Sequence, residues 1–206
     1  MKRDKDSSRT IEFFTQKLAQ HGWGHKAVNW GSADGQMLRF KVLTEVGDLN
    51  GRSVLDVGCG CGQFVEYLTG QGISIEYIGC DITPAMIESA GQKFPNRRFE
   101  VRDILAEAAS REPQVDYVVA SGIFYLRQTD PHDYLKDMVA RMFALARKAV
   151  AFNTLSILAT DIDEREFYAD PARVLADCLD ITSSVTLRHD YMPHDFTVYL
   201  YRENEL

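Results

Sequence analysis

The chain has 206 residues, enough for one domain with a full hydrophobic core and too few for two ordinary domains. Hydrophobic residues make up 45% of it and charged residues 26%, which is ordinary for a soluble globular protein. The formal net charge of −7 disfavours a nucleic-acid partner, because only Lys2-Arg3 and Arg97-Arg98 form short basic clusters.

The cysteines do not have the spacing of a metal site or a disulfide framework. They are expected to be small buried thiols in a reducing compartment, at Cys59, Cys61, Cys80 and Cys178. The first nine residues are charged and polar, unlike a signal peptide, and no apolar run reaches the roughly 18 residues of a membrane span. We therefore expect a cytoplasmic protein without a metal or a membrane segment.

About fifty residues precede the first strand of the predicted core. Residues 1–8 are expected to be frayed, and a helix is expected from about Thr10 to Gln20 with Ile11, Phe14 and Leu18 on one face. A glycine-rich turn follows at residues 21–25. Ser32 or Asp34 is then expected to cap a second helix that continues to about residue 46.

A buried strand is predicted at residues 53–57, and it is followed by an unusual glycine-rich turn, Gly58-Cys59-Gly60-Cys61-Gly62. A helical pattern begins at Gln63. Such a strand, turn and helix form the entry of a nucleotide-binding α/β domain, in which glycine lets a ligand approach the backbone.

The next strand is predicted at residues 75–80 and ends at Asp81, about 20 positions beyond the glycine turn. An acidic residue at this position binds ribose hydroxyls in Rossmann-type sites. Thr83 and Pro84 then begin another helix, with the threonine hydroxyl as its expected cap.

Two stretches resemble motifs I and II of the class I S-adenosylmethionine-dependent methyltransferases: Ser-Val-Leu-Asp-Val-Gly-Cys-Gly-Cys-Gly from Ser53, and Tyr-Ile-Gly-Cys-Asp-Ile-Thr-Pro-Ala-Met-Ile from Tyr77. Dinucleotide dehydrogenases have a different spacing, Gly-x-Gly-x-x-Gly. The resemblance covers the chain from about Leu49 onward. It implies S-adenosylmethionine as the cofactor, one methyltransferase domain over residues 1–206, a helical cover at 1–48 and a cofactor-binding core at 49–206.

The resemblance also implies roles for individual residues. Asp56 suits the ammonium of the cofactor, Asp81 its ribose, and Ile82 its adenine, while Asp103 with Ile104 follows the third strand (residues 99–102) near the adenine amino group. In the cover, Arg39 is expected to pair with the cofactor carboxylate and Trp30 to close over the site. The full set of predicted cofactor contacts is Asp56, Gly58, Cys59, Gly60, Asp81, Ile82, Asp103, Ile104, Ser121, Arg39 and Trp30.

The pattern of the second half of the chain predicts the remaining strands of the sheet and how the last two pair. A fourth strand at 116–120, a helix from 131 to about 148, a fifth strand at 149–152 and a helix from 171 to about 179 precede two strands, at 184–187 and 196–201. The short link between these last two requires them to be antiparallel. We therefore predict a Rossmann-like, seven-stranded, mostly parallel sheet with helices on both faces and an antiparallel C-terminal hairpin.

Methyl transfer from a sulfonium needs alignment of the nucleophile, exclusion of water and, for some acceptors, a base. Ser121 to Tyr125 follow the fourth strand, where ligands of α/β sheets bind. Candidate catalytic residues or substrate contacts are His194, His189, Tyr125 and Asn153.

The fourth strand is followed by Ser121-Gly122-Ile123-Phe124 rather than by Asn/Asp-Pro-Pro-Tyr or an acidic metal-binding set. The sequence thus predicts a metal-independent methyltransferase that acts on O or N of a small molecule. Two alternatives stay open: a non-catalytic S-adenosylmethionine-binding partner protein and a nicotinamide-dependent oxidoreductase. The oligomeric state is not predicted.

Overall fold

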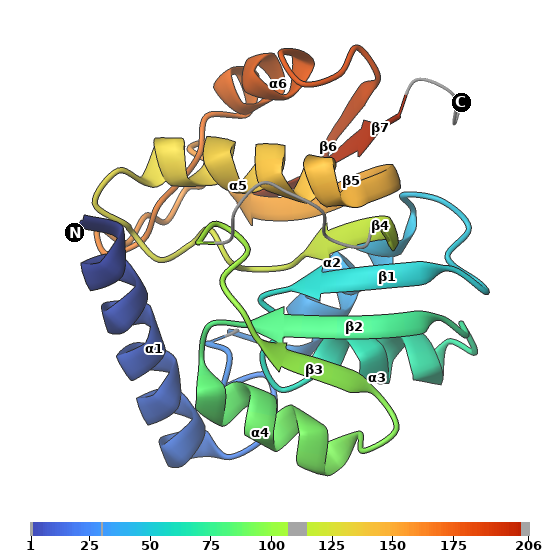
Figure 1. The fold of residues 1–206 in the computed structure, drawn as a ribbon. Coiled ribbons are helices and arrows are strands. Elements are labelled where there is room, and N and C mark those ends of the chain that lie inside the picture. Colours follow the sequence, from blue (N-terminus) through green and yellow to red (C-terminus); the bar gives the residue numbers. More distant parts are fainter. Residues whose placement is uncertain (1, 30, 107–114, 203–206) are drawn as a thin grey trace. The chain divides into compact units, whose positions relative to one another are not determined.

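The computed structural model describes residues 2–29, 31–106 and 115–202. Seven strands form a sheet in the order β3-β2-β1-β4-β5-β7-β6, with helices around it (Figure 1). Pairing is parallel in β1 with β2, β2 with β3 and β4 with β5, and antiparallel in β5 with β7 and β6 with β7. The predicted fold class is confirmed, including the antiparallel hairpin at the end. The chain divides into two compact units, Met1–Asp103 and Ile104–Leu206.

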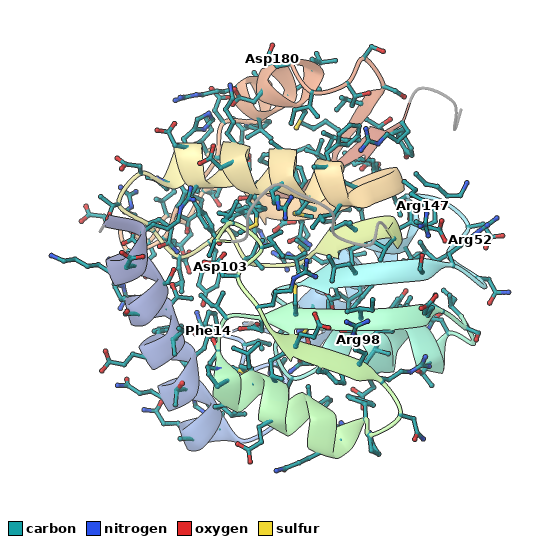
Figure 2. All side chains as sticks on the ribbon, viewed as in Figure 1. Phe14, Arg52, Arg98, Asp103, Arg147 and Asp180 are labelled. Carbon is teal, nitrogen blue, oxygen red and sulfur yellow. The ribbon has the colours of Figure 1, made fainter. Side chains whose placement is uncertain are left out.

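The first unit carries three parallel strands of the sheet. Its elements are α1 (Lys2–His21), α2 (Ala33–Thr44), β1 (Ser53–Val57), α3 (Gln63–Gly70), β2 (Glu76–Asp81), α4 (Pro84–Lys93) and β3 (Arg98–Val101). Val57 pairs with Cys80, so the carboxyl ends of β1 and β2 lie side by side. Helix α4 packs on β2 and β3, and α1 packs on α4. Figure 2 shows Asp103 just beyond the end of β3.

The prediction that residues 1–8 are frayed is wrong, because α1 begins at Lys2. Charged side chains favour its N-terminal half: Asp4 lies in the first turn, and Arg9 pairs with Asp6 at 3.1 Å. Pairs of this spacing and an acidic residue in the first turn favour a helix. The periodicity of apolar residues, on which the prediction of this helix depended, does not include such polar interactions.

The two other predicted caps in this unit differ in outcome. Ser32 Oγ accepts a hydrogen bond from Gly35 N at 3.0 Å, which confirms Ser32 as the cap of α2. Thr83 lies at the cap position of α4, but its hydroxyl makes no capping bond, so that prediction is wrong. The main-chain N–H of Thr83 instead donates to Asp81 Oδ1 at 2.8 Å.

The second unit carries the other four strands. Its elements are β4 (Val115–Ala120), α5 (Pro131–Leu145), β5 (Ala146–Leu155), α6 (Pro171–Leu179), β6 (Val185–Met192) and β7 (Asp195–Tyr201). Helix α5 packs on β4 and β5, and α6 packs on β6, β7 and α5. The Phe124 ring contacts Phe152 and Tyr134, with centroids 5.5 and 6.0 Å apart, in the core of this unit.

Two predicted boundaries in the second unit are wrong. Helix α5 ends at Leu145 rather than near Lys148, because Ala146 already pairs with Val115 as the first residue of β5. The predicted link at residues 188–195 is mostly strand: β6 continues to Met192, and only Pro193 and His194 connect it to β7. A register shift between Arg188 and Met192 lets the hairpin extend this far.

Two further expectations concern the cysteines and membrane-spanning helices. All four cysteines are buried and unpaired, as predicted. In the part of the chain that the structure describes, no helix is both long enough and apolar enough to cross a membrane.

Candidate functional site

The glycine turn is tied to the end of β2 by its own backbone. Gly58 N and Cys59 N both donate to the Cys80 carbonyl, at 2.8 and 3.0 Å. Gly58, Gly60 and Gly62 have φ values of 70°, 54° and 82°, in the left-handed region that favours glycine. The alternating glycines thus let the chain reverse between β1 and α3 while it stays bonded to β2.

Asp81 connects this turn to the next helix. Its Oδ2 accepts from Gly60 N at 3.1 Å and its Oδ1 accepts from Thr83 N at 2.8 Å. Burial raises the pKa of Asp81, and the N–H donors of Thr83 and Gly60 oppose that shift. An ionised carboxylate has about four acceptor positions, so the Asp81 oxygens can accept further hydrogen bonds from donors such as the hydroxyls of a vicinal diol.

Asp56, at the fourth position of β1, is a buried carboxyl group. Its Oδ2 accepts from the Tyr77 hydroxyl at 2.7 Å, and 3% of the residue is exposed. Burial raises the pKa of Asp56 to about 7; the Tyr77 hydrogen bond lowers it and the charge of Asp81 adds to the rise. A cation nearby would favour ionisation of this group.

Gly79 makes the contact between Asp56 and Tyr77 possible. It lies opposite Asp56 in the pairing of β1 with β2. A Cβ on Gly79 would lie 2.9 Å from the Tyr77 hydroxyl and 2.8 Å from a ring carbon of Phe99. The absent side chain is therefore the space through which Tyr77 reaches the carboxylate.

A segment of the N-terminal cover, residues 23–29, lies on the glycine turn. Trp23 Nε1 donates to the Cys61 carbonyl at 2.9 Å, and Gln63 Nε2 donates to the Gly24 carbonyl at 3.2 Å. A Cβ on Gly60 would lie 2.7 Å from Val28 Cγ1. At Gly60 the group that approaches the backbone closely is thus a side chain of the same protein.

The second unit holds a polar cluster where β4 ends. Asn153 on β5 is 1% exposed; its Oδ1 accepts from Gly122 N at 2.9 Å and its Nδ2 donates to Ser121 Oγ at 3.1 Å. Both ends of the amide are engaged with the turn after β4. Asn153 therefore fixes the position of Ser121 and Gly122.

The other predicted catalytic residues lie around the same edge of this unit. The Tyr125 carbonyl accepts from Phe167 N at 2.8 Å, which joins the chain after β4 to the chain after β5. His194 is exposed in the two-residue turn between β6 and β7, and its carbonyl accepts from Ser156 N at 3.1 Å. His189 lies within β6, and its ring stacks on Phe196 with centroids 5.9 Å apart.

Comparison with known proteins assigns the family. A family model described as a methyltransferase domain matches residues 54–148. The chain is 32% identical over 153 residues to Rv1506c of Mycobacterium tuberculosis, which bears the name of a methyltransferase; the match covers 71% of this chain and 90% of that protein. The chain belongs to the class I S-adenosylmethionine-dependent methyltransferases.

One further relative matches over a shorter stretch, and one solved structure has a similar fold. The trans-aconitate 2-methyltransferase of Variovorax paradoxus is 33% identical over 91 residues, which is 44% of this chain and 33% of that enzyme. The chain thus matches only a third of that enzyme's length. The crystal structure of magnesium protoporphyrin IX methyltransferase from Synechocystis, with bound S-adenosylmethionine, matches with a TM-score of 0.67 at 17% identity, over 96% of this chain and 97% of that one. This likeness supports the fold.

Family membership rules out the nicotinamide oxidoreductase alternative. Within this methyltransferase, the structure brings together the predicted residues Gly58, Cys59, Gly60 and Asp81 in one unit, and Ser121 with Asn153 in the other. Arg39 is 5% exposed and its Nη1 donates to the Gly35 carbonyl at 3.2 Å, within α2. Trp30 lies outside the described residues. Ile82 and Asp103 are half-buried, and Ile104 is buried.

Three residues of the site were missed by sequence reasoning: Trp23, Val28 and Tyr77. For Tyr77 a signal exists. Residues 77 and 79 lie on the same face of β2, and Gly79 pairs with Asp56 of β1, so the Tyr77 side chain lies near Asp56. For Trp23 and Val28 no local pattern indicates which turn they cover. Among the described residues, no three His, Cys, Asp or Glu side chains gather as metal ligands.

Proposed function

We propose that this methyltransferase binds S-adenosylmethionine at the glycine turn and transfers its methyl group to O or N of a small molecule, without a metal. The observation that carries the proposal is the Asp81 carboxylate, which bridges Gly60 N and Thr83 N and keeps acceptor positions for a ribose diol. Membership in the family supports the reaction.

The residues present fit the cofactor by their chemistry. Asp81 would accept the ribose hydroxyls, Asp56 would balance the ammonium, and Arg39 would pair with the carboxylate. Ile82 and Asp103 would contact the adenine. When bound, the sulfonium supplies an activated methyl group with an excellent leaving group. The chain's own task is then to orient the acceptor, exclude water and accept a proton where the acceptor requires it.

The proposed acceptor is a small molecule. Relatives are named for such acceptors, among them trans-aconitate, and the net charge of −7 disfavours a polyanion such as RNA. Ser121, held by Asn153 beyond the end of β4, is the proposed acceptor-side contact, with Tyr125 and His194 as the other candidates.

Calorimetric titration tests cofactor binding. The purified protein is titrated with S-adenosylmethionine, S-adenosylhomocysteine and NADH, alongside Asp81→Ala and the control Asp48→Ala, an exposed carboxylate in the loop before β1. Both adenosyl ligands should bind in the micromolar range, and Asp81→Ala should weaken their binding about tenfold or more, since a half-buried acceptor is lost. Binding of NADH instead, or equal binding by Asp81→Ala, would refute the proposed site.

The acceptor class is tested by transfer of a radiolabelled methyl group. A panel of small carboxylic acids, phenols and amines, including trans-aconitate, is compared with bulk RNA, DNA and protein. Labelling confined to small molecules is expected, with and without a chelator. Robust labelling of a macromolecule, or loss of activity in the chelator, would contradict the corresponding part of the proposal.

A further inference from the structure

Residues 23–29, here called the clasp, make their main contacts with the glycine turn itself. Trp23 binds the Cys61 carbonyl, Gly24 accepts from Gln63, and Val28 lies against Gly60. The partners are two neighbouring residues in the second half of the turn, Gly60 and Cys61, and the first residue of α3, Gln63. A displacement of the clasp therefore removes contacts from the second half of the turn and from the start of α3.

Lys93 holds Trp23 from its other side. Its ammonium lies over the face of the Trp23 ring, in the arrangement of a cation–π interaction, and Nζ donates to Glu66 Oε1 at 2.9 Å. The Lys93 side chain is 34% exposed and that of Glu66 48%. The indole is thus fixed at its N–H by the turn and at its face by a cation that bridges α3 and α4.

Six of the seven residues of the clasp are exposed or half-buried. Trp23 is 36% exposed, whereas Ala27 is fully buried and anchors the middle of the segment. Asn29 adopts φ of 58°, a left-handed conformation that asparagine tolerates better than most residues. Segments with few buried contacts open with a lower free energy than the core around them.

We propose that the clasp is a gate on the glycine turn, with Trp23 as a positioning residue that acts through the Cys61 carbonyl and Lys93 as its lock. The rate at which an adenosyl ligand enters and leaves is then set by opening of the clasp. This inference rests on the proposed function, because it specifies the regulation of the same site. Since closed and open clasp share the ligand contacts made by Asp81, opening changes the rates more than the affinity.

Hydrogen exchange of the protein without ligand tests whether Trp23 and Lys93 hold the clasp closed. The amides of residues 24–29 are followed in the wild type, in Trp23→Phe, which keeps an aromatic ring but loses the indole N–H, and in Lys93→Gln. Lys17→Gln is the matched control, because Lys17 lies over the Phe13 ring on α1, outside the clasp. Exchange in 24–29 should rise about tenfold in the first two variants and not in the control, with β1 and β2 unchanged. Unchanged exchange in 24–29, or a uniform rise throughout the unit, would overturn the proposal.

Ligand kinetics test the gate. Radiolabelled S-adenosylhomocysteine is bound to each protein and chased with excess unlabelled ligand. Trp23→Phe and Lys93→Gln should each raise the association and dissociation rates fivefold or more, with a change in Kd below threefold. Unchanged rates, or a loss of affinity through dissociation alone, would overturn the gate and leave the proposed function standing. Failure of the wild type to bind would instead refute the proposed function. If Trp23→Phe does not fold, Lys93→Gln at the surface carries the test.

Discussion

At the residue scale, the notable feature of the site is a pair of acidic side chains at adjoining strand ends. Asp56 is buried and its pKa is raised to about 7, and the charge of Asp81 contributes to that rise. Two such groups in one place cost free energy unless something offsets them. Their arrangement therefore favours a ligand that brings a cation to Asp56 and donors to Asp81.

Removing the hydroxyl of Tyr77 tests what supports Asp56. Tyr77→Phe should lower the free energy of unfolding by about 1–3 kcal/mol at pH 8, because a buried carboxylate loses its hydrogen-bond donor. The loss should be smaller at pH 5, where the carboxyl is protonated. Urea unfolding at both pH values measures it. Tyr67→Phe is the control, a half-buried tyrosine whose ring packs on Phe40 and Phe64; equal effects of the two substitutions would contradict the role of Tyr77.

Sequence reasoning identified the residues whose role depends on spacing along the chain. Asp81 and Gly60 were both predicted, because the end of a strand and a glycine turn can be recognised locally. Tyr77 and Val28 were not, because their roles depend on which side chain fills the space left by Gly79 or Gly60. A glycine in a sequence indicates that another group approaches the backbone closely, but it does not identify that group.

At the scale of elements, the turn after β4 depends on a neighbouring strand. Asn153 on β5 binds Gly122 N and Ser121 Oγ, so the position of this turn is set by one residue that follows them in the chain by 31 and 32 positions. The amide satisfies one donor and one acceptor of a turn that has no regular pairing of its own.

Substitution of adjacent residues on β5 separates this role from packing. Asn153→Leu should cost about 1–3 kcal/mol in unfolding free energy and speed hydrogen exchange at the Gly122 amide, which loses its acceptor. Thr154→Val should be neutral or stabilising, because the Thr154 hydroxyl is buried without a partner in the described part of the chain. Chemical denaturation and exchange measure both; an equal loss of stability in Thr154→Val would show that packing dominates at this strand.

Element types were predicted well, and boundaries failed where tertiary pairing overrides the local pattern. Residues 146–148, Ala-Arg-Lys, continue a helical pattern, yet Arg147 extends along β5 and its Nε donates to Asp116 Oδ1 at 3.3 Å. Likewise Tyr191, read as part of a link, belongs to β6 and binds Asp195 and Thr197 of β7. Neither pairing leaves a signal within a short window of sequence.

At the scale of the whole molecule, the raised pKa of Asp56 makes folding depend on pH. Below about pH 4 the group is protonated in both states. Between about pH 4 and 7 the unfolded state ionises while the folded state keeps its proton, so stability falls as pH rises; above about 7 the loss is complete.

Asp56→Asn removes this dependence. The free energy of unfolding of the wild type minus that of the variant should fall by about 2–3 kcal/mol from pH 5 to pH 8, because one pKa unit corresponds to about 1.4 kcal/mol. Urea denaturation at the two pH values measures the difference, in which other titrating groups cancel. A difference independent of pH would place the pKa of Asp56 near its ordinary value.

The fold of the molecule could be predicted because two kinds of information coincide in the sequence. Alternating strand and helix patterns gave a parallel sheet, and the short distance between the last two strands required antiparallel pairing. The positions of side chains in the N-terminal segment could not be predicted, because they depend on tertiary contacts such as that of Trp23 with the Cys61 carbonyl.

The buried cysteines have a consequence for how motions of the protein can be observed. Burial raises the pKa of Cys61 to about 11 and that of Cys178 to about 12, and raises those of Cys59 and Cys80 as well. Since the thiolate is the reactive form, an alkylating reagent at neutral pH modifies these residues only when their surroundings open. Three of these thiols lie in the turn and strand of the first unit and one in α6 of the second. Each unit thus contains at least one buried thiol, and the rate of alkylation of each cysteine reports how often the structure around it opens.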